Sequence, residues 1–127
     1  MNQYRLNQIM TATPQQLVLM LYDRALRDLR QAKEAIEAKD PIAAGRLLVH
    51  LEEILDELLV GLDLDAGGDI ALNLGRLYDY CIIRCREANV TKDLTIVDEL
   101  HQLFSDFRQT WAEAMIKAKQ EEGSLQE

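Results

Sequence analysis

The chain has 127 residues, enough for one domain that buries a hydrophobic core without disulfides or metals. It carries 14 Lys and Arg against 22 Asp and Glu, and its net charge of −8 repels phosphate, which argues against nucleic acid as a partner. Because no uncharged apolar run reaches about 18 residues and the start does not resemble a signal peptide, we expect a cytoplasmic protein without stable membrane insertion.

Residues 1–12 form a polar segment with a few scattered apolar side chains, among them Tyr4 and Ile9. A segment this short and this weakly periodic does not form a stable helix unless it packs against something else. We expect it to lie on the rest of the domain or to stay free in solution.

Thr13, Pro14 and Gln16 form a strong helix start, with a hydroxyl N-cap, proline at the first helical position and a capping-box partner. The spacing predicts a helix over 14–38. Its apolar face contains Val18, Leu21, Tyr22, Ala25, Leu29, Ala32 and Ile36. Three further apolar residues lie outside this face: Leu19, Met20 and Leu26. They pack either against the chain itself or against a partner, and the pattern favours neither alternative.

Asp40 and Pro41 repeat the combination of N-cap and proline, and they predict a second helix from 41 to about 62. Its leucines form a face wide enough to contact two neighbouring helices, which is typical of a bundle. The aspartates and glycines of 63–69 do not form a calcium-binding loop, because Leu74 stands where such a loop needs its glutamate. We interpret this stretch as a helix stop followed by Asp69 as the next N-cap.

The third helix, expected to end at Asn89, carries more apolar surface than one core needs. At the helical period one face contains Leu74, Leu77, Tyr78, Cys81, Cys85 and Ala88. Leu72, Tyr80 and Ile83 point elsewhere. A helix with apolar residues beyond its core face is either wholly buried or binds a partner, and a chain this short leaves little room for whole burial.

A turn over 90–93 leads into a fourth helix with the clearest apolar face of the sequence: Val97, Leu100, Phe104, Phe107, Trp111, Met115 and Ala118. The charged tail, 120–127, should fray. Four amphipathic helices with short connections predict an all-α fold, an antiparallel up-down-up-down four-helix bundle, as a single domain over 1–127 with 1–12 as an N-terminal cap segment. In this bundle we expect Leu51, Tyr78, Phe104 and Trp111 to be substantially buried.

The sequence contains no pattern typical of a catalytic or metal site. Cys81 and Cys85 lie four residues apart on one helix, where a disulfide is hard to close, so we expect two reduced packing residues. With His50 and His101 they lack the spacing of a zinc site. Asp98 and His101 form one copy of a pair that a di-iron bundle needs twice, and no haem, phosphate-loop or nucleophile-elbow motif occurs. We expect no enzyme, no metal and no cofactor.

Several blocks, in order, resemble the FliS family of flagellin chaperones. They are TATPQQLVLMLYDRAL over 11–26, LYDYCIIRCREAN over 77–89 with the Asp93 that follows, and FRQTWAEA over 107–114. The resemblance extends from Tyr4 to about Ala118. The two cysteines depart from it, since methionine or leucine and another aliphatic residue are expected at their positions.

The resemblance implies a cytoplasmic, non-enzymatic chaperone. Such a protein binds the C-terminal segment of flagellin, prevents premature polymerisation and delivers flagellin to the export gate protein of the flagellar type III apparatus. In the family the N-terminal segment covers a hydrophobic surface when the client is absent, and Tyr4 stands where the family has its N-terminal tyrosine.

We hypothesise that the apolar residues left outside the core faces form the groove for a flagellin helix. Tyr4 and Ile9 would plug this groove reversibly, and Arg76 and Arg84 would line its rim opposite client carboxylates. The predicted partner-binding residues are Tyr4, Ile9, Leu19, Leu26, Leu72, Arg76, Tyr80, Ile83 and Arg84. The alternative is a self-associating bundle, a structural or regulatory interaction module whose surplus apolar face forms a weak homodimer interface.

Overall fold

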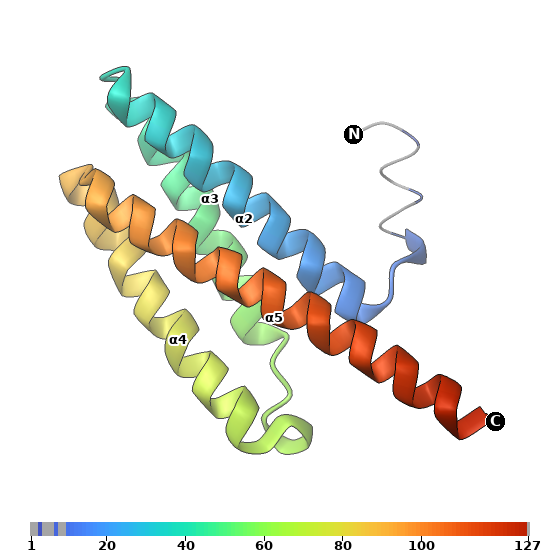
Figure 1. Cartoon of the computed structure of the whole chain (residues 1–127). Coiled ribbons are helices and arrows are strands. Elements are labelled where there is room, and N and C mark those ends of the chain that lie inside the picture. Colours follow the sequence, from blue (N-terminus) through green and yellow to red (C-terminus); the bar gives the residue numbers. More distant parts are fainter. Residues whose placement is uncertain (1–2, 4–6, 8–9, 127) are drawn as a thin grey trace.

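The structure is a computed structural model that describes residues 3, 7 and 10–126. Its long helices are α2 (Pro14–Glu37), α3 (Pro41–Val60), α4 (Leu64–Thr91) and α5 (Leu94–Gln126) (Figure 1). α2 packs beside α3 and α5, and α4 also packs beside α3 and α5, so α2 and α4 lie on one diagonal of the bundle. The predicted all-α, up-down-up-down four-helix bundle is confirmed.

Local hydrogen bonds explain where the first two long helices begin. The Thr13 hydroxyl accepts from the Gln16 backbone N–H at 3.2 Å, and the Gln16 side chain accepts from the Thr13 N–H at 2.9 Å, which completes the predicted capping box. The Asp40 carboxylate accepts from the Ala43 N–H at 3.1 Å and starts α3. Both predicted starts are confirmed.

The break predicted over 63–69 is wrong in its extent. The Asp63 carboxylate accepts from the Ala66 N–H at 3.0 Å and starts a first helical turn of α4, so helical structure begins before the predicted N-cap at Asp69. The glycines leave only a kink at Gly68, whose φ of 55° and ψ of −134° are not helical. α4 also continues past Asn89 to Thr91.

The core fills the space between the four helices, and several aromatic rings contact one another in it. Phe104 and Phe107 lie 5.4 Å apart between centroids, and Tyr22 and Tyr78 exchange a hydrogen bond across the diagonal of the bundle. The expected burial of Leu51, Tyr78 and Phe104 is confirmed.

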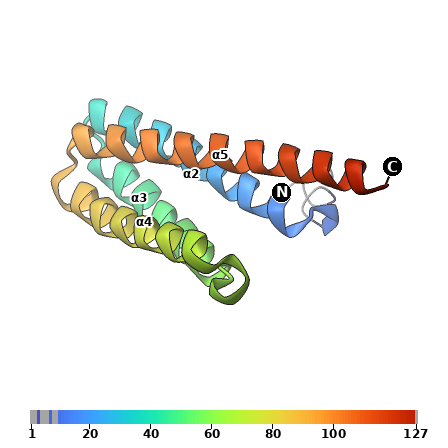
Figure 2. The same cartoon turned by 60° about the horizontal axis from the view of Figure 1, so that its bottom comes forward.

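Trp111 is partly buried, and its indole N–H donates to the backbone oxygen of Gln15 at 2.9 Å. This bond ties the middle of α5 to the first turn of α2. Beyond it, α5 extends past the turn that joins α3 and α4, whereas the α3–α4 pair diverges from α5 (Figure 2). The residues predicted to fray are helical up to Gln126, and their fraying in solution stays a prediction.

A buried acid links α2 to α3. Asp28 is almost fully buried and forms a short hydrogen bond with His50, whose second ring nitrogen lies 3.0 Å from an Arg24 guanidinium nitrogen. The neutral tautomer with hydrogen on Nδ1 satisfies both contacts, since it donates to the carboxylate and accepts from the guanidinium.

Candidate partner-binding surface

Large apolar side chains are exposed mainly on the adjacent helices α3 and α4. Those on α3 are Ile42, Val49 and Val60, and those on α4 are Leu64, Ile70, Leu72, Leu77, Tyr80, Ile83 and Val90. Elsewhere within α2 and α5 the described residues include one such side chain each, Leu17 and Ile116. The α3–α4 side of the bundle therefore differs from the α2–α5 side, and exposed apolar area gathered on one side is typical of a protein-binding surface.

On α4 three of the predicted partner-binding residues are exposed as expected. Leu72, Tyr80 and Ile83 have 44%, 43% and 63% of their surface accessible. Leu77 is also 42% exposed, so its assignment to the core face is wrong.

The apolar residues of α3 on this side were missed by the sequence analysis. Ile42, Val49 and Val60 are separated by 7 and 11 residues, and both intervals return to the same side of a helix. The Cys85 thiol donates to the Leu48 backbone oxygen at 3.1 Å, which sets the register of α3 against α4. This spacing was the signal that could have identified the three residues.

Several polar groups on α4 are engaged within the bundle. The Tyr80 hydroxyl and the Arg84 Nε both donate to the same oxygen of Glu99 on α5, each at 2.9 Å. Another Arg84 nitrogen donates to Glu87 at 2.7 Å. The hydrogen bond to Glu99 raises the pKa of the Tyr80 hydroxyl. The hydrogen bond from Arg84, and to a smaller extent that from Tyr80, lowers the pKa of the Glu99 carboxyl.

Arg76 differs from Arg84 in this respect. It is exposed, one turn from both Leu72 and Tyr80, and among the described residues it has no hydrogen-bond or ion-pair partner. Of the two predicted rim cations, only Arg76 is therefore free to bind a carboxylate from outside.

The predicted set does not form a single groove. Leu19 and Leu26 are half-buried residues of α2, and Leu26 packs against the core. Because α2 is diagonal to α4, these two residues do not lie beside the exposed face of α4. Tyr4 and Ile9, the proposed plug, lie outside the described residues.

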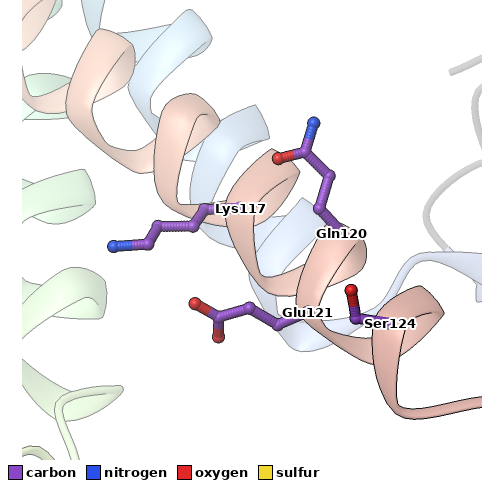
Figure 3. Close-up of a pocket in the computed structure, with 4 residues that line it drawn as sticks. All are labelled: Lys117, Gln120, Glu121 and Ser124. Carbon is purple, nitrogen blue, oxygen red and sulfur yellow. The ribbon is translucent and has the colours of Figure 1, made fainter.

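Two hollows of the described surface lie on α2 and α5, apart from the exposed apolar residues of α3 and α4. One, of about 580 Å³, is lined by Lys117, Gln120, Glu121 and Ser124 on the last turns of α5, with Lys117 and Glu121 extending to the same side (Figure 3). A smaller one, of about 180 Å³, lies between α2 and α5 above Leu29 and Val97. Neither contains a nucleophile beside a base.

Chemistry at the cysteines is disfavoured by their surroundings. Both thiols are free and fully buried, and burial raises the pKa of each to about 12, which keeps them protonated and unreactive near neutral pH. Within the described part of the chain no three His, Cys, Asp or Glu residues are placed to hold a metal ion, and no helix there is long and apolar enough to cross a membrane.

Solved structures define the class of protein to which this fold belongs. A crystal structure of a flagellar chaperone from bacteria matches with a TM-score of 0.78 and 27% sequence identity, covering 87% of this chain and 90% of that chain. This chain thus has the fold of a flagellar chaperone of known structure.

The family model described as flagellar protein FliS matches residues 1–119. The flagellar secretion chaperone FliS of Salmonella typhimurium is 38% identical over 90% of this chain and 85% of its own length, and that of Bacillus subtilis is 33% identical over 88% and 83%. FliSB of Pseudomonas aeruginosa is 35% identical over 82% of each chain. The chain belongs to the FliS family of flagellar secretion chaperones, which are not enzymes.

Proposed function

We propose that this chain acts in the cytoplasm and binds the C-terminal segment of flagellin on the exposed apolar face of α3 and α4. By covering that segment it prevents premature polymerisation, and it delivers flagellin to the export gate of the flagellar type III apparatus. The observation that carries the proposal is the concentration of exposed apolar side chains on these two helices.

The shape of this face suits an extended partner. α3 and α4 are 20 and 28 residues long, pack side by side and carry apolar residues from one end to the other. A segment that is disordered before assembly can wrap around such a surface and bury apolar area along its whole length. It loses chain entropy when it becomes ordered on binding. Helical stretches of the client would place side chains at three- and four-residue spacing against it.

Electrostatics restrict where acidic client residues bind. Arg76 lies between Leu72 and Tyr80 along α4 and has no hydrogen-bond or ion-pair partner within the part of the chain that the structure describes. We assign to it the contact with a client carboxylate, because Arg84 is already held by Glu87 and Glu99. The apolar residues flanking Arg76 would shield that ion pair from water and salt.

Residues 1–12 would compete with the client for the exposed apolar face. If Tyr4 and Ile9 occupy apolar positions on this face in the free protein, the client has to displace them, which lowers its apparent affinity. Deleting residues 1–10 should then strengthen client binding while leaving the melting temperature nearly unchanged. A large loss of melting temperature would assign the segment to the folded core instead.

The experiment is to mix the purified full chain with a peptide of the flagellin C-terminal segment and to measure the mass of the product by size-exclusion chromatography with light scattering. We expect a complex of one chain with one peptide. A peptide of the same composition in scrambled order is the control. A stable dimer of the chain that the peptide does not dissociate would favour the self-associating module instead.

A further inference from the structure

Glu99 is the one residue of α5 whose side chain bonds to two side chains on the exposed part of α4 among the described residues. Its Oε1 accepts from Tyr80 and from Arg84 at 2.9 Å each. Tyr80 is the aromatic residue among the exposed apolar side chains described on this face, whereas Glu99 lies beside that face. The network therefore connects a proposed client contact to a helix outside the client surface.

Arg84 serves to hold Glu99 in place. Its guanidinium is shared between Glu99 and Glu87, and only 24% of its side chain is exposed. An arginine with two carboxylate partners fixes both acceptors, since its donors have a rigid planar geometry. Arg84 is thus a strut between α4 and α5, which differs from the role at the groove rim predicted for it.

The link through Arg84 joins α4 and α5, which pack less extensively than the other neighbouring pairs of helices. The two helices diverge with distance from the turn that joins them (Figure 2). Because 43% of the Tyr80 surface is accessible, neighbouring side chains enclose the ring only in part, and the hydroxyl bond to Glu99 further restricts its orientation.

We propose that Glu99 is a positioning residue for client binding, which holds the Tyr80 ring in the orientation that receives an apolar anchor of the client. The inference rests on the proposed function, because it assigns Glu99 a role at the same face. A tyrosine whose hydroxyl is anchored before binding loses less rotational freedom when the client arrives. Removing the anchor should weaken binding about 2- to 12-fold, the range that corresponds to ordering one side chain.

The test is a double-mutant cycle on the full chain, with flagellin peptide capture measured by calorimetry. Glu99→Ala and Tyr80→Phe each remove one partner of the bond, and Tyr80→Phe keeps the ring. If Glu99 acts through the hydroxyl, Glu99→Ala weakens binding in the wild-type background and has no further effect in the Tyr80→Phe background. Asp98→Ala is the matched control, since it removes the same charge from the adjacent position, where the carboxylate pairs with Lys33.

A second measurement separates positioning from general destabilisation. With tyrosine ring carbons labelled for NMR, the Tyr80 pKa should be lower in Glu99→Ala than in the wild type, because the carboxylate no longer favours the protonated hydroxyl. The melting temperature should change little for this exposed group.

The outcomes separate the two proposals. Unchanged affinity in Glu99→Ala, or a loss of affinity that persists in the Tyr80→Phe background, would overturn the role of Glu99 while leaving the proposed function intact. Failure of the wild-type chain to capture the peptide would overturn the proposed function itself, and the role of Glu99 with it.

Discussion

Tyr22 and Tyr78 place two hydroxyl groups in the middle of an apolar core. Both residues are almost fully buried, and each hydroxyl is the partner of the other. A complete hydrogen-bonded pair of this kind contributes modestly to the free energy of unfolding. If one hydroxyl is removed, the other stays buried without a partner, and its desolvation cost is no longer offset. The bond connects α2 to α4 across the diagonal, where the helices have little other contact.

This arrangement predicts a non-additive pair of substitutions. Tyr78→Phe should lower the free energy of unfolding by about 1–3 kcal/mol, because it leaves the Tyr22 hydroxyl buried without a partner. The double variant Tyr22→Phe/Tyr78→Phe should cost less than the sum of the two single variants. Urea denaturation of the four proteins measures this coupling, and strictly additive losses would contradict the account.

The buried thiols predict how stability depends on alkaline pH. The ordinary thiol pKa is 9.0, and burial raises that of Cys81 and Cys85 to about 12. Between these values the unfolded chain releases protons that the folded chain retains, so the unfolded state binds fewer protons and stability falls as pH rises. Each thiol should contribute a slope of about 1.4 kcal/mol per pH unit over this window.

Urea denaturation of the wild type at a series of pH values from 8 to 11, chosen on the thiol pKa of 9.0, measures this slope. The matched variant is Cys81→Ala/Cys85→Ala, which lacks both thiols and should show a shallower dependence from pH 9. The remaining slope should begin near pH 10, where unfolded tyrosines ionise while burial keeps Tyr22 and Tyr78 protonated. Equal slopes in both proteins would contradict the burial of the thiols.

At the scale of the helices, Gly68 determines the shape of α4. A side chain at this position would meet no atom within 4 Å, so space does not explain the glycine. Its φ of 55° and ψ of −134° do explain it, because residues with a Cβ rarely adopt that conformation. The kink it permits lets the first turn of α4 begin at Asp63 and still join the rest of the helix.

Two alanine substitutions test whether backbone conformation, and not the available space, explains the glycine at position 68. Gly68→Ala should destabilise the protein by about 1–3 kcal/mol through backbone strain. Gly123→Ala, also in open space but at a helical position of the α5 tail, should raise helicity and be neutral or stabilising by up to about 1 kcal/mol. Thermal unfolding followed by circular dichroism at 222 nm compares them, and a harmless Gly68→Ala would show that α4 does not need the kink.

Helix starts that depend on neighbouring residues were predictable, and those that depend on competing signals were not. Thr13 and Asp40 each precede a proline and bond to the backbone three residues later, a pattern complete within the sequence. Around 63–69 two N-caps and two glycines compete. The glycines predict a helix stop, whereas the Asp63 carboxylate starts a helical turn before them. Both signals act in the structure, because the helix begins at Asp63 and is kinked at Gly68.

At the scale of the whole molecule, the apolar face of α4 was predictable in part. Leu72, Tyr80 and Ile83 fall outside the core face of an isolated helix, and they are exposed. Leu77 was placed on the core face and is 42% exposed, because coverage by neighbouring helices is a tertiary property that the period of one helix does not contain. Glu99 lies 15 residues from Arg84, so local spacing could not indicate their pairing.

The α3 contribution was missed for a different reason. The leucines of that helix form a face wide enough to explain its packing, so the sequence offered no reason to consider Ile42, Val49 and Val60 separately. The structure assigns the leucines to the core and leaves these three residues on the outside, beside α4. Only the packing of α3 between α2 and α4 decides which of its apolar residues remain exposed.

The central claim is that flagellin binds the α3–α4 side of the bundle, and two matched isoleucines test it most directly. Ile83 on α4 and Ile116 on α5 are 63% and 60% exposed, so aspartate at either position should be tolerated by the fold to a similar extent. Calorimetry with the flagellin C-terminal peptide should show affinity weakened about tenfold or more by Ile83→Asp, as expected when a charge replaces an apolar anchor, and unchanged by Ile116→Asp. Unchanged affinity in a folded Ile83→Asp variant, or an equal loss in both variants, would contradict this placement of the client.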